Sequence, residues 1–164
     1  EIGEKGTFGK HTLWSESTRV PLMIKLPGMK GGKKINNPVE LLDLYPTLLE
    51  VTNLPKNPLN EGKSLVSLIN GKTEDSGLAI TTYGMNNHSL INQTHRYIKY
   101  EDGSEELYDI INDPDERNNI ANQDGSNVIK SNFLKHIPSL NEPWSSSSYN
   151  TVNEYFRRTS NSED

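Results

Sequence analysis

Cysteine is absent from this chain of 164 residues. The chain therefore forms no disulfide and holds no cysteine-ligated metal. Apolar residues make up only 32% of the sequence, so any core is small or is shared with other sequence. No apolar run approaches the roughly 18–20 residues that a membrane-spanning helix needs. The sequence thus predicts a protein without a membrane span.

Positive charge is also scarce, with 17 Lys and Arg residues against 22 Asp and Glu residues and a formal net charge of −5. A nucleic-acid surface needs a clustered positive field. The one basic cluster, Lys30, Lys33 and Lys34, lies in a glycine-rich segment and is interpreted as a solvated loop. We therefore expect no nucleic-acid partner.

Several catalytic signatures are missing as well. There is no G-x-S-x-G elbow, phosphate-binding loop or dinucleotide fingerprint. The histidines are not at metal-ligand spacing; they are His11, His88, His95 and His136. The first residue is Glu1, and no signal-peptide pattern follows it. The opening run is typical of the interior of a domain, so we expect the natural N-terminus to be missing and the core to be shared with sequence outside this chain.

The first half of the chain predicts one strand and two helices. Val20–Leu26 is almost continuously apolar, which is typical of a buried strand covered on both faces in a mixed or parallel sheet. A helix is predicted next, with Asn37 as its cap, Pro38 in its first position and a kink or restart at Pro46. Lys63–Leu68 predicts a second short helix.

From residue 78 the pattern changes to short strands, predicted over 78–83, 89–92, 96–100 and 105–110. Asp102-Gly103 indicates a hairpin turn between the last two. Val128–His136 predicts one amphipathic helix, and the residues beyond it are rich in Ser and Asn. The fold class is therefore α/β, as an α+β fragment: the last strand or strands of a large mixed sheet, then a C-terminal subdomain with a small antiparallel sheet and a packed helix.

The opening segment is the best candidate for chemistry. Lys10 lies in a glycine-containing loop that leads to the predicted strand. Loops at strand ends are where α/β enzymes place reactive groups, and a lysine offers a compact cation to an anionic group. The alternative is an ordinary surface lysine.

Residues 3–21, G-E-K-G-x-x-G-K-H-T-L-W-x-E-S-T-R-V-P, resemble a signature of the type I, formylglycine-dependent sulfatases of the alkaline phosphatase superfamily. Later segments resemble that family in the same order: V-E-L-L-D-L-Y-P-T-L-L (39–49), E-G-K-S-L (61–65), R-Y-I-K-Y (96–100), and E-L-Y-D (106–109) followed by N-D-P-D-E (112–116). The likeness runs from Glu1 to about Ala121. It is nearest to the iduronate-sulfatase-like branch that acts on polysaccharides.

The resemblance implies a whole protein that hydrolyses sulfate esters, with sulfated carbohydrate as the substrate. It implies a formylglycine that attacks sulfur and a Ca²⁺ ion, both held outside this chain by the N-terminal part of the same enzyme. It also implies a periplasmic or secreted location. Residues 1–75 would end the catalytic domain, 76–140 would form the antiparallel-sheet subdomain, and 141–164 would be a polar tail.

Lys10 matches the family lysine that contacts the sulfate near its bridging oxygen, so the resemblance implies a catalytic role for it. We predict substrate contacts for His11, Asn87 and His88, the last two in a polar loop between strands. For His11 the alternative is packing under its loop, and for His88 it is a capping or exposed position. Glu16 and Arg19 are interpreted as structural, either as a buried ion pair or with the arginine bonded to the backbone.

Two other functions stay open. A phosphonate monoester hydrolase or phosphodiesterase of the same superfamily would use a similar loop. Alternatively, the chain could be a non-catalytic binding remnant that kept the subdomain. The residues that hold the nucleophile and the metal would discriminate among these functions, and none of them is predicted in this chain.

Overall fold

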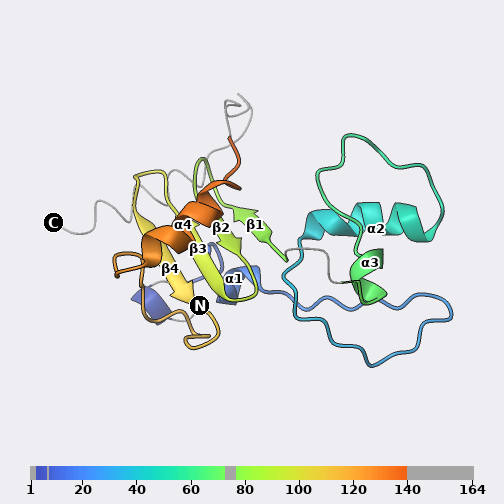
Figure 1. Cartoon of the computed structure of the whole chain (residues 1–164), viewed down its shortest axis with the longest axis horizontal. Coiled ribbons are helices and arrows are strands. Elements are labelled where there is room, and N and C mark those ends of the chain that lie inside the picture. Colours follow the sequence, from blue (N-terminus) through green and yellow to red (C-terminus); the bar gives the residue numbers. More distant parts are fainter. Residues whose placement is uncertain (1–2, 7, 73–76, 140–164) are drawn as a thin grey trace.

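The computed structural model describes residues 3–6, 8–72 and 77–139. A four-stranded sheet with helix α4 lies at one end of the molecule, and helices α2 and α3 with two long loops lie at the other (Figure 1). The elements in chain order are η1 (Glu4–Gly6), α1 (Ser15–Thr18), η2 (Leu41–Asp43), α2 (Leu44–Val51), α3 (Val66–Ile69), β1 (Ala79–Thr82), β2 (His88–Ile91), β3 (His95–Lys99), β4 (Glu105–Asp109) and α4 (Ser126–Leu134).

The predicted antiparallel sheet is confirmed. Its strands follow the order β1-β2-β3-β4, so each strand pairs with the next one along the chain. Gly103 supplies the left-handed conformation that the β3–β4 turn needs, with φ of +88°. The Asp102 carboxylate accepts a hydrogen bond from the Ser104 N–H at 2.8 Å and closes the same turn. Asp102-Gly103 thus forms the predicted hairpin turn.

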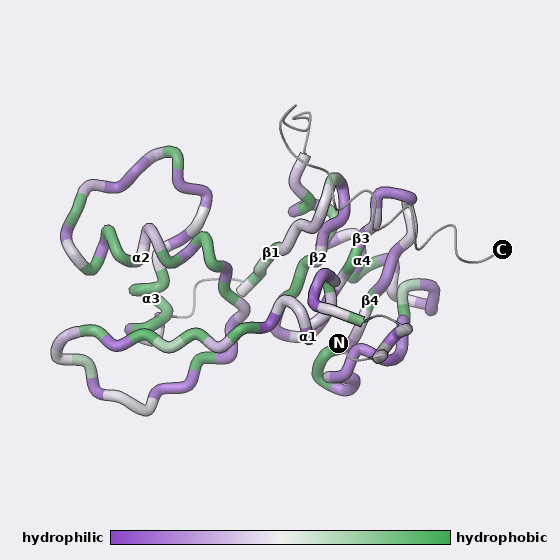
Figure 2. The backbone as a smooth tube through the Cα atoms, turned by 180° about the vertical axis from the view of Figure 1, so that it is seen from behind, coloured by the Kyte–Doolittle hydropathy of each residue, from purple (hydrophilic) through white to green (hydrophobic). Residues whose placement is uncertain are grey.

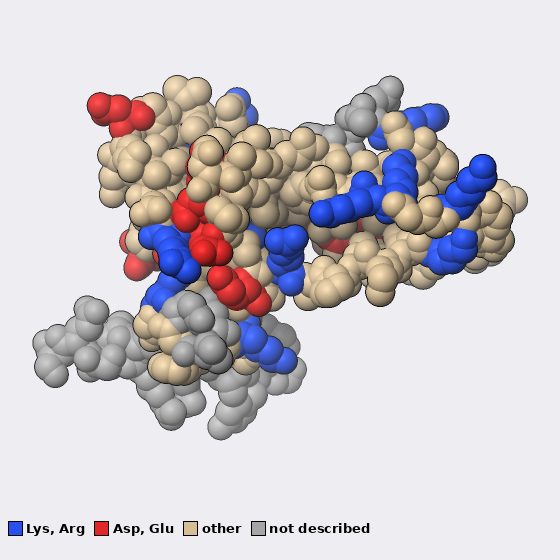
Figure 3. All heavy atoms as spheres, turned by 90° about the horizontal axis from the view of Figure 1, so that it is seen from below, with Lys and Arg blue, Asp and Glu red and all other residues tan. Residues whose placement is uncertain are grey.

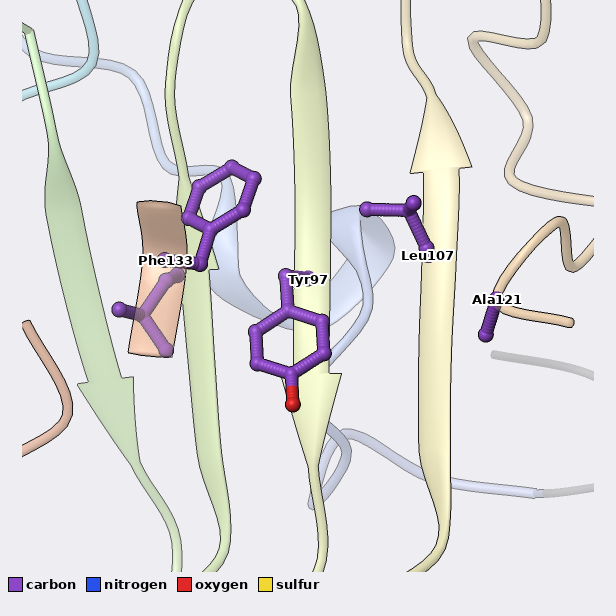
Figure 4. Close-up of a cluster of buried hydrophobic side chains, with 5 residues drawn as sticks. Tyr97, Leu107, Ala121 and Phe133 are labelled. Carbon is purple, nitrogen blue, oxygen red and sulfur yellow. The ribbon is translucent and has the colours of Figure 1, made fainter. Parts of the chain in front are cut away.

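Helix α4 covers one face of the sheet, as predicted from its amphipathic pattern. The buried cluster on this face consists of Leu90, Tyr97, Leu107, Ala121 and Phe133. Figure 4 shows the Tyr97 and Phe133 rings beside one another, with ring centroids 5.8 Å apart. Each of these side chains is at most 3% exposed, so this face forms the larger core.

The N-terminal segment covers the opposite face. Leu13 packs there against Ile98 of β3 and Tyr108 of β4, and all three are buried. Trp14 packs at the margin of the same cluster. Since side chains alternate between the two faces of a strand, the sheet has one core under α4 and a second core under residues 13–14.

The predicted helix is present, but it begins later than predicted and changes from a 3-10 turn to an α-helix at Leu44, two residues before Pro46. The 3-10 turn η2 runs directly into α2, and Pro46 is the third residue of α2, where its N–H would have no partner within the helix. Glu40, rather than Asn37, is the N-cap. Its N–H donates to the Asp43 carboxylate at 2.8 Å, and the Glu40 side chain accepts from the Asp43 N–H in return. This reciprocal capping box fixes the start of the helix.

The buried Asp43 also holds the segment that leads to α3. Its other oxygen accepts from the Lys63 N–H at 2.8 Å. The Thr47 hydroxyl accepts from the Leu65 N–H at 2.8 Å, so a second bond joins the same two segments. The backbone of Gly62 runs so close to η2 that an added Cβ would lie 2.1 Å from the Leu42 carbonyl oxygen.

The prediction of a buried strand at Val20–Leu26 is wrong. The segment has no strand pairing, and the side chains of Val20 and Met23 are 56% and 92% exposed. Figure 2 shows the run as a largely hydrophobic stretch of tube at the edge of the molecule. No strand of the described residues lies beside it, so its backbone groups have no ladder to join.

Two smaller interpretations also change. Glu16 and Arg19 are both exposed, so they form no buried ion pair. Lys33 is not simply solvated, because its ammonium donates to the Ile69 carbonyl at 2.7 Å and caps the end of α3. In Figure 3 acidic side chains gather over the sheet end of the molecule, whereas Lys and Arg predominate at the α2 end. The predicted tail at 141–164 lies outside the described residues.

Gly62→Ala should destabilise the α2–α3 unit. The added methyl group would meet backbone atoms, which move only with the helix, so overpacking should cost about 1–3 kcal/mol. Thermal unfolding of the variant and the wild type measures the loss. Gly31→Ala is the matched control, because nothing lies within 4 Å of the added Cβ. Equal midpoints for the two variants would contradict the close approach.

Candidate functional site

Lys10 and His11 lie in an exposed loop, residues 8–12, that precedes α1 and that we call the Lys10 loop. The His11 ring is tilted against the Tyr83 ring, with centroids 5.7 Å apart. Tyr83 directly follows β1. The structure therefore brings the loop with the two predicted site residues to the β1–β2 turn, near Asn87 and away from α4.

Asn87 is buried, and its side chain holds two turns together. Its amide nitrogen donates to the Met85 carbonyl at 2.9 Å, and its amide oxygen accepts from the Glu101 N–H at 3.1 Å. The Asn87 carbonyl also accepts from the Tyr83 N–H at 3.0 Å. The geometry gives Asn87 a clear structural role, and its contact with substrate stays a prediction.

His88 is not in a loop, as the sequence predicted, but is the first residue of β2. Pairing between Thr82 and His88 extends the ladder to this position. The His88 side chain is 2% exposed, and its Nδ1 lies 2.9 Å from the Thr82 hydroxyl. Burial, together with the positive charge of Lys99, lowers the pKa of His88 below its usual value.

The sheet also separates His88 from Lys10. His88 and Leu90 are two residues apart on one strand, so they point to the same face. Leu90 belongs to the core under α4. Tyr83, which contacts His11, packs with the core on the opposite face. The structure brings Lys10, His11 and the Asn87 turn together, and it places His88 on the other side of the sheet.

A buried ion pair anchors the segment that follows Lys10 and His11. Arg96 of β3 and Glu116 are 2% and 1% exposed, and Arg96 Nε lies 2.5 Å from Glu116 Oε1. Glu116 accepts from both the N–H and the hydroxyl of Ser15, at 2.9 and 2.7 Å. Arg96 in turn donates to the Leu13 carbonyl at 3.1 Å and to the Ser89 hydroxyl at 2.6 Å.

Glu106 of β4 makes a second anchor. Trp14 Nε1 donates to Glu106 Oε2 at 2.6 Å, and the Tyr108 hydroxyl donates to the same oxygen at 2.8 Å. Burial and the Glu106 carboxylate raise the pKa values of Tyr100 and Tyr108, so both phenols stay protonated as donors. The Lys5 ammonium lies 4.6 Å from the Trp14 ring centroid and 4.2 Å from that of Tyr108, which adds cation–π attraction.

The described residues offer little else that resembles a site. Within residues 3–6, 8–72 and 77–139, no group of three or more His, Asp or Glu side chains is placed to hold a metal ion. None of the helices described there is long and apolar enough to cross a membrane. An open cavity of about 350 Å³ lies between α4 and the β2–β3 turn, lined in part by Asn92, His95 and His136. The predicted site residues are not among those lining it.

Residues 3–142 match a family model described as N-sulphoglucosamine sulphohydrolase, C-terminal. The chain belongs to this family. The match confirms the resemblance to the C-terminal portion of sulfatases, and it includes the Lys10 loop, both anchors and the whole sheet.

Curated relatives agree with the assignment to this sulfatase family. The chain is 44% identical over 159 residues to a Sulfatase of Formosa agariphila, covering 94% of this chain and 31% of that protein. It is 30% identical over 134 residues to Arylsulfatase K of Homo sapiens, covering 72% of this chain and 25% of that protein. The chain thus spans about a quarter to a third of the length of these two relatives.

A solved structure, BT1596, described as a 2-O GAG sulfatase, matches with a TM-score of 0.52 at 20% sequence identity. The match covers 79% of this chain and 27% of that one. At this identity the likeness shows the fold alone. It confirms the predicted mixed α/β class, with the small antiparallel sheet and its helices.

Three residues of this sulfatase domain that bind residues 13–15 were not predicted from the sequence: Arg96, Glu106 and Glu116. One signal was available. In R-Y-I-K-Y the period of a strand places Arg96 on the same face as the apolar Ile98. A charged residue on a buried face needs a partner. Glu116 sits in a polar turn, and only the fold shows that it is this partner.

The lowered pKa of His88 predicts a pH-dependent contribution to stability. The folded chain protonates His88 only at a lower pH than the unfolded chain, in which a histidine becomes protonated below about pH 6.5. The unfolded state therefore binds more protons, so stability should fall as the pH drops from 7.5 to 5. His88→Gln should flatten this part of the dependence. Urea unfolding at a series of pH values measures it, and parallel curves for wild type and variant would contradict the assignment.

Proposed function

We propose that this chain is the C-terminal part of a sulfatase that hydrolyses sulfate esters, and that Lys10 binds the sulfuryl group. The family match over residues 3–142 carries the proposal. The loop geometry supports it, because Lys10 is exposed while the residues just after it are anchored on the sheet. An anchored backbone with an exposed ammonium suits a group that must meet an anion in a fixed position.

Lys10 would act on the charge that develops as the S–O bond breaks. Negative charge then grows on the sulfuryl oxygens and on the leaving oxygen. A fixed ammonium in a site that excludes water stabilises this charge more in the transition state than in the ground state. His11 beside Tyr83 would flank the same anion and contact the rest of the substrate.

Sulfated carbohydrate is the proposed substrate class. The relatives include proteins named as sulfatases, and the matching solved structure is described as a 2-O GAG sulfatase. A tyrosine and a histidine beside a lysine supply an apolar ring face together with polar tips, which suits a sugar ring that carries an anionic group. Such a substrate is consistent with a periplasmic or secreted enzyme.

The remaining machinery would come from the N-terminal part of the same enzyme. That part would hold Ca²⁺ and the formylglycine, whose chemistry is nucleophilic attack on sulfur, so the piece described here would be inactive alone. A surface of this chain is suited to such a partner. It is apolar and exposed along η2 and α2, where Leu41, Tyr45 and Leu48 are 70%, 53% and 59% exposed, and along Val20–Leu26.

Lys10→Ala in the full-length enzyme should lower kcat for a sulfate ester by about 10²–10³-fold, the usual cost of removing one transition-state donor. Lys30→Ala is the control, because this lysine is equally exposed but lies in the glycine-rich loop. Steady-state kinetics with an aryl sulfate give the result. A near-normal kcat would sink the role of Lys10, and preferential turnover of a phosphonate monoester would favour the other branch of the superfamily.

Leu48→Lys should separate the isolated chain from the full-length enzyme. In the isolated chain this exposed position should tolerate the charge within about 0.5 kcal/mol. In the full-length enzyme it would bury a charge against the N-terminal part and should lower the free energy of unfolding by about 2 kcal/mol or more. Val128→Lys, at a position 69% exposed on α4, should be neutral in both. Denaturant unfolding of the four proteins tests this, and neutrality of Leu48→Lys throughout would exclude the interface.

A further inference from the structure

Two carboxylates hold the three residues that follow the Lys10 loop. Glu116 is 1% exposed and accepts both the N–H and the hydroxyl of Ser15. Glu106 accepts the indole N–H of Trp14 at 2.6 Å. Between them Leu13 is 3% exposed, and its carbonyl accepts from Arg96. Each of residues 13–15 is therefore held by a charged side chain: Leu13 by Arg96, Trp14 by Glu106 and Ser15 by Glu116.

This arrangement limits where Lys10 can go. Lys10 precedes Leu13 by three residues, which span at most about 10 Å of extended chain. The Thr12 hydroxyl lies 2.7 Å from the Ser17 hydroxyl of α1, so Thr12 is also held against this helix. The ring contact between His11 and Tyr83 adds a third restraint, at the β1–β2 turn.

Stability alone is a poor explanation for the buried pair of Arg96 and Glu116. Moving two charges out of water costs about as much as their attraction returns, and apolar replacements of similar volume are often neutral or stabilising. The apolar core under α4 does not use them. The pair instead fixes the position of the N-terminal segment, because each of its bonds holds a particular atom of Leu13 or Ser15.

We propose that Glu106 and Glu116, with Arg96, form a clamp whose function is to position the Lys10 loop for catalysis. The three are positioning residues, because they act through Leu13, Trp14 and Ser15 rather than on substrate. The inference rests on the proposed role of Lys10. Misplacing a catalytic group by about 1 Å can cost about 10²-fold in rate, so loosening the clamp should affect turnover without removing any group that touches substrate.

Trp14→Phe tests the clamp in the full-length enzyme, because it keeps an aromatic ring and deletes the bond to Glu106. We expect kcat for an aryl sulfate to fall about 10-fold to 10²-fold, with KM changed less than about threefold. In the Lys10→Ala background the same substitution should have no further effect, since the clamp acts through Lys10. Equal losses in both backgrounds would overturn the proposal.

Phe133→Leu is the control for general destabilisation, because Phe133 lies in the core on the other face of the sheet. It should lower the unfolding temperature while leaving kcat near its wild-type value. If kcat falls together with the unfolding temperature in both Trp14→Phe and Phe133→Leu, the clamp only stabilises the fold and the proposal is wrong.

Hydrogen exchange separates failure of the clamp from failure of the proposed function. Trp14→Phe should speed amide exchange in residues 8–15 and leave β2 and α4 unchanged. Unchanged exchange in residues 8–15 would overturn the clamp. If Lys10→Ala keeps full activity, the proposed role of Lys10 fails, and faster exchange confined to residues 8–15 would still support a clamp on the loop.

Discussion

The buried pair of Arg96 and Glu116 joins three parts of the molecule that are distant in sequence. Each charge is almost completely removed from water, so each needs partners for its remaining hydrogen-bonding groups. Arg96 finds them at Leu13 and Ser89, and Glu116 finds them at Ser15. The N-terminal segment, the sheet and the turn after β4 are therefore mutually dependent, because withdrawing any one of them leaves an unsatisfied charge in the interior.

The backbone around Glu116 is shaped for this purpose. Glu116 adopts a left-handed conformation, with φ of 54°, which is uncommon for a residue with a side chain. The Asp113 carbonyl accepts from the Glu116 N–H at 3.0 Å, and the Asp113 carboxylate accepts from Arg117 and Asn118. A turn held by its own aspartate thus tolerates a strained residue and aims its carboxylate inward. The D-P-D-E motif is best understood as the support of this carboxylate.

Local patterns predicted the parts of the fold that local physics decides. Alternation and turn residues between 78 and 110 were sufficient for the four strands, and the helical period located α4. The start of the α2 region was misplaced because Asn37-Pro38 and the Glu40–Asp43 box are both valid start signals, and only packing selects between them. The composition of Val20–Leu26 favours a buried strand, but a strand also needs a neighbouring strand to pair with, which composition does not supply.

The candidate site was predicted only in part, because local sequence locates its residues but does not show which of them the fold brings together. Motif likeness located Lys10 and His11, and the fold places them beside the Asn87 turn. The pairing of His88 with Thr82 extends β2 by one residue, which turns a predicted loop histidine into a buried strand residue on the far face. The pairing of Arg96 with Glu116 is not predictable from the sequence, because the two residues are distant in sequence and no periodic pattern connects a strand arginine with a turn glutamate.

That distance also determines the order in which the domain can form. Ser15 and Glu116 are separated by 101 residues, and Ser15 and Arg96 by 81. A chain emerging from the ribosome folds from its N-terminal end, yet the bonds of Leu13 and Ser15 to Arg96 and Glu116 can form only after the sheet and the turn beyond it have been synthesised. Docking of this segment on the sheet therefore closes a long loop, at an entropic cost. The position of Ser15, five residues after Lys10, thus depends on side chains that are synthesised 81 and 101 residues later.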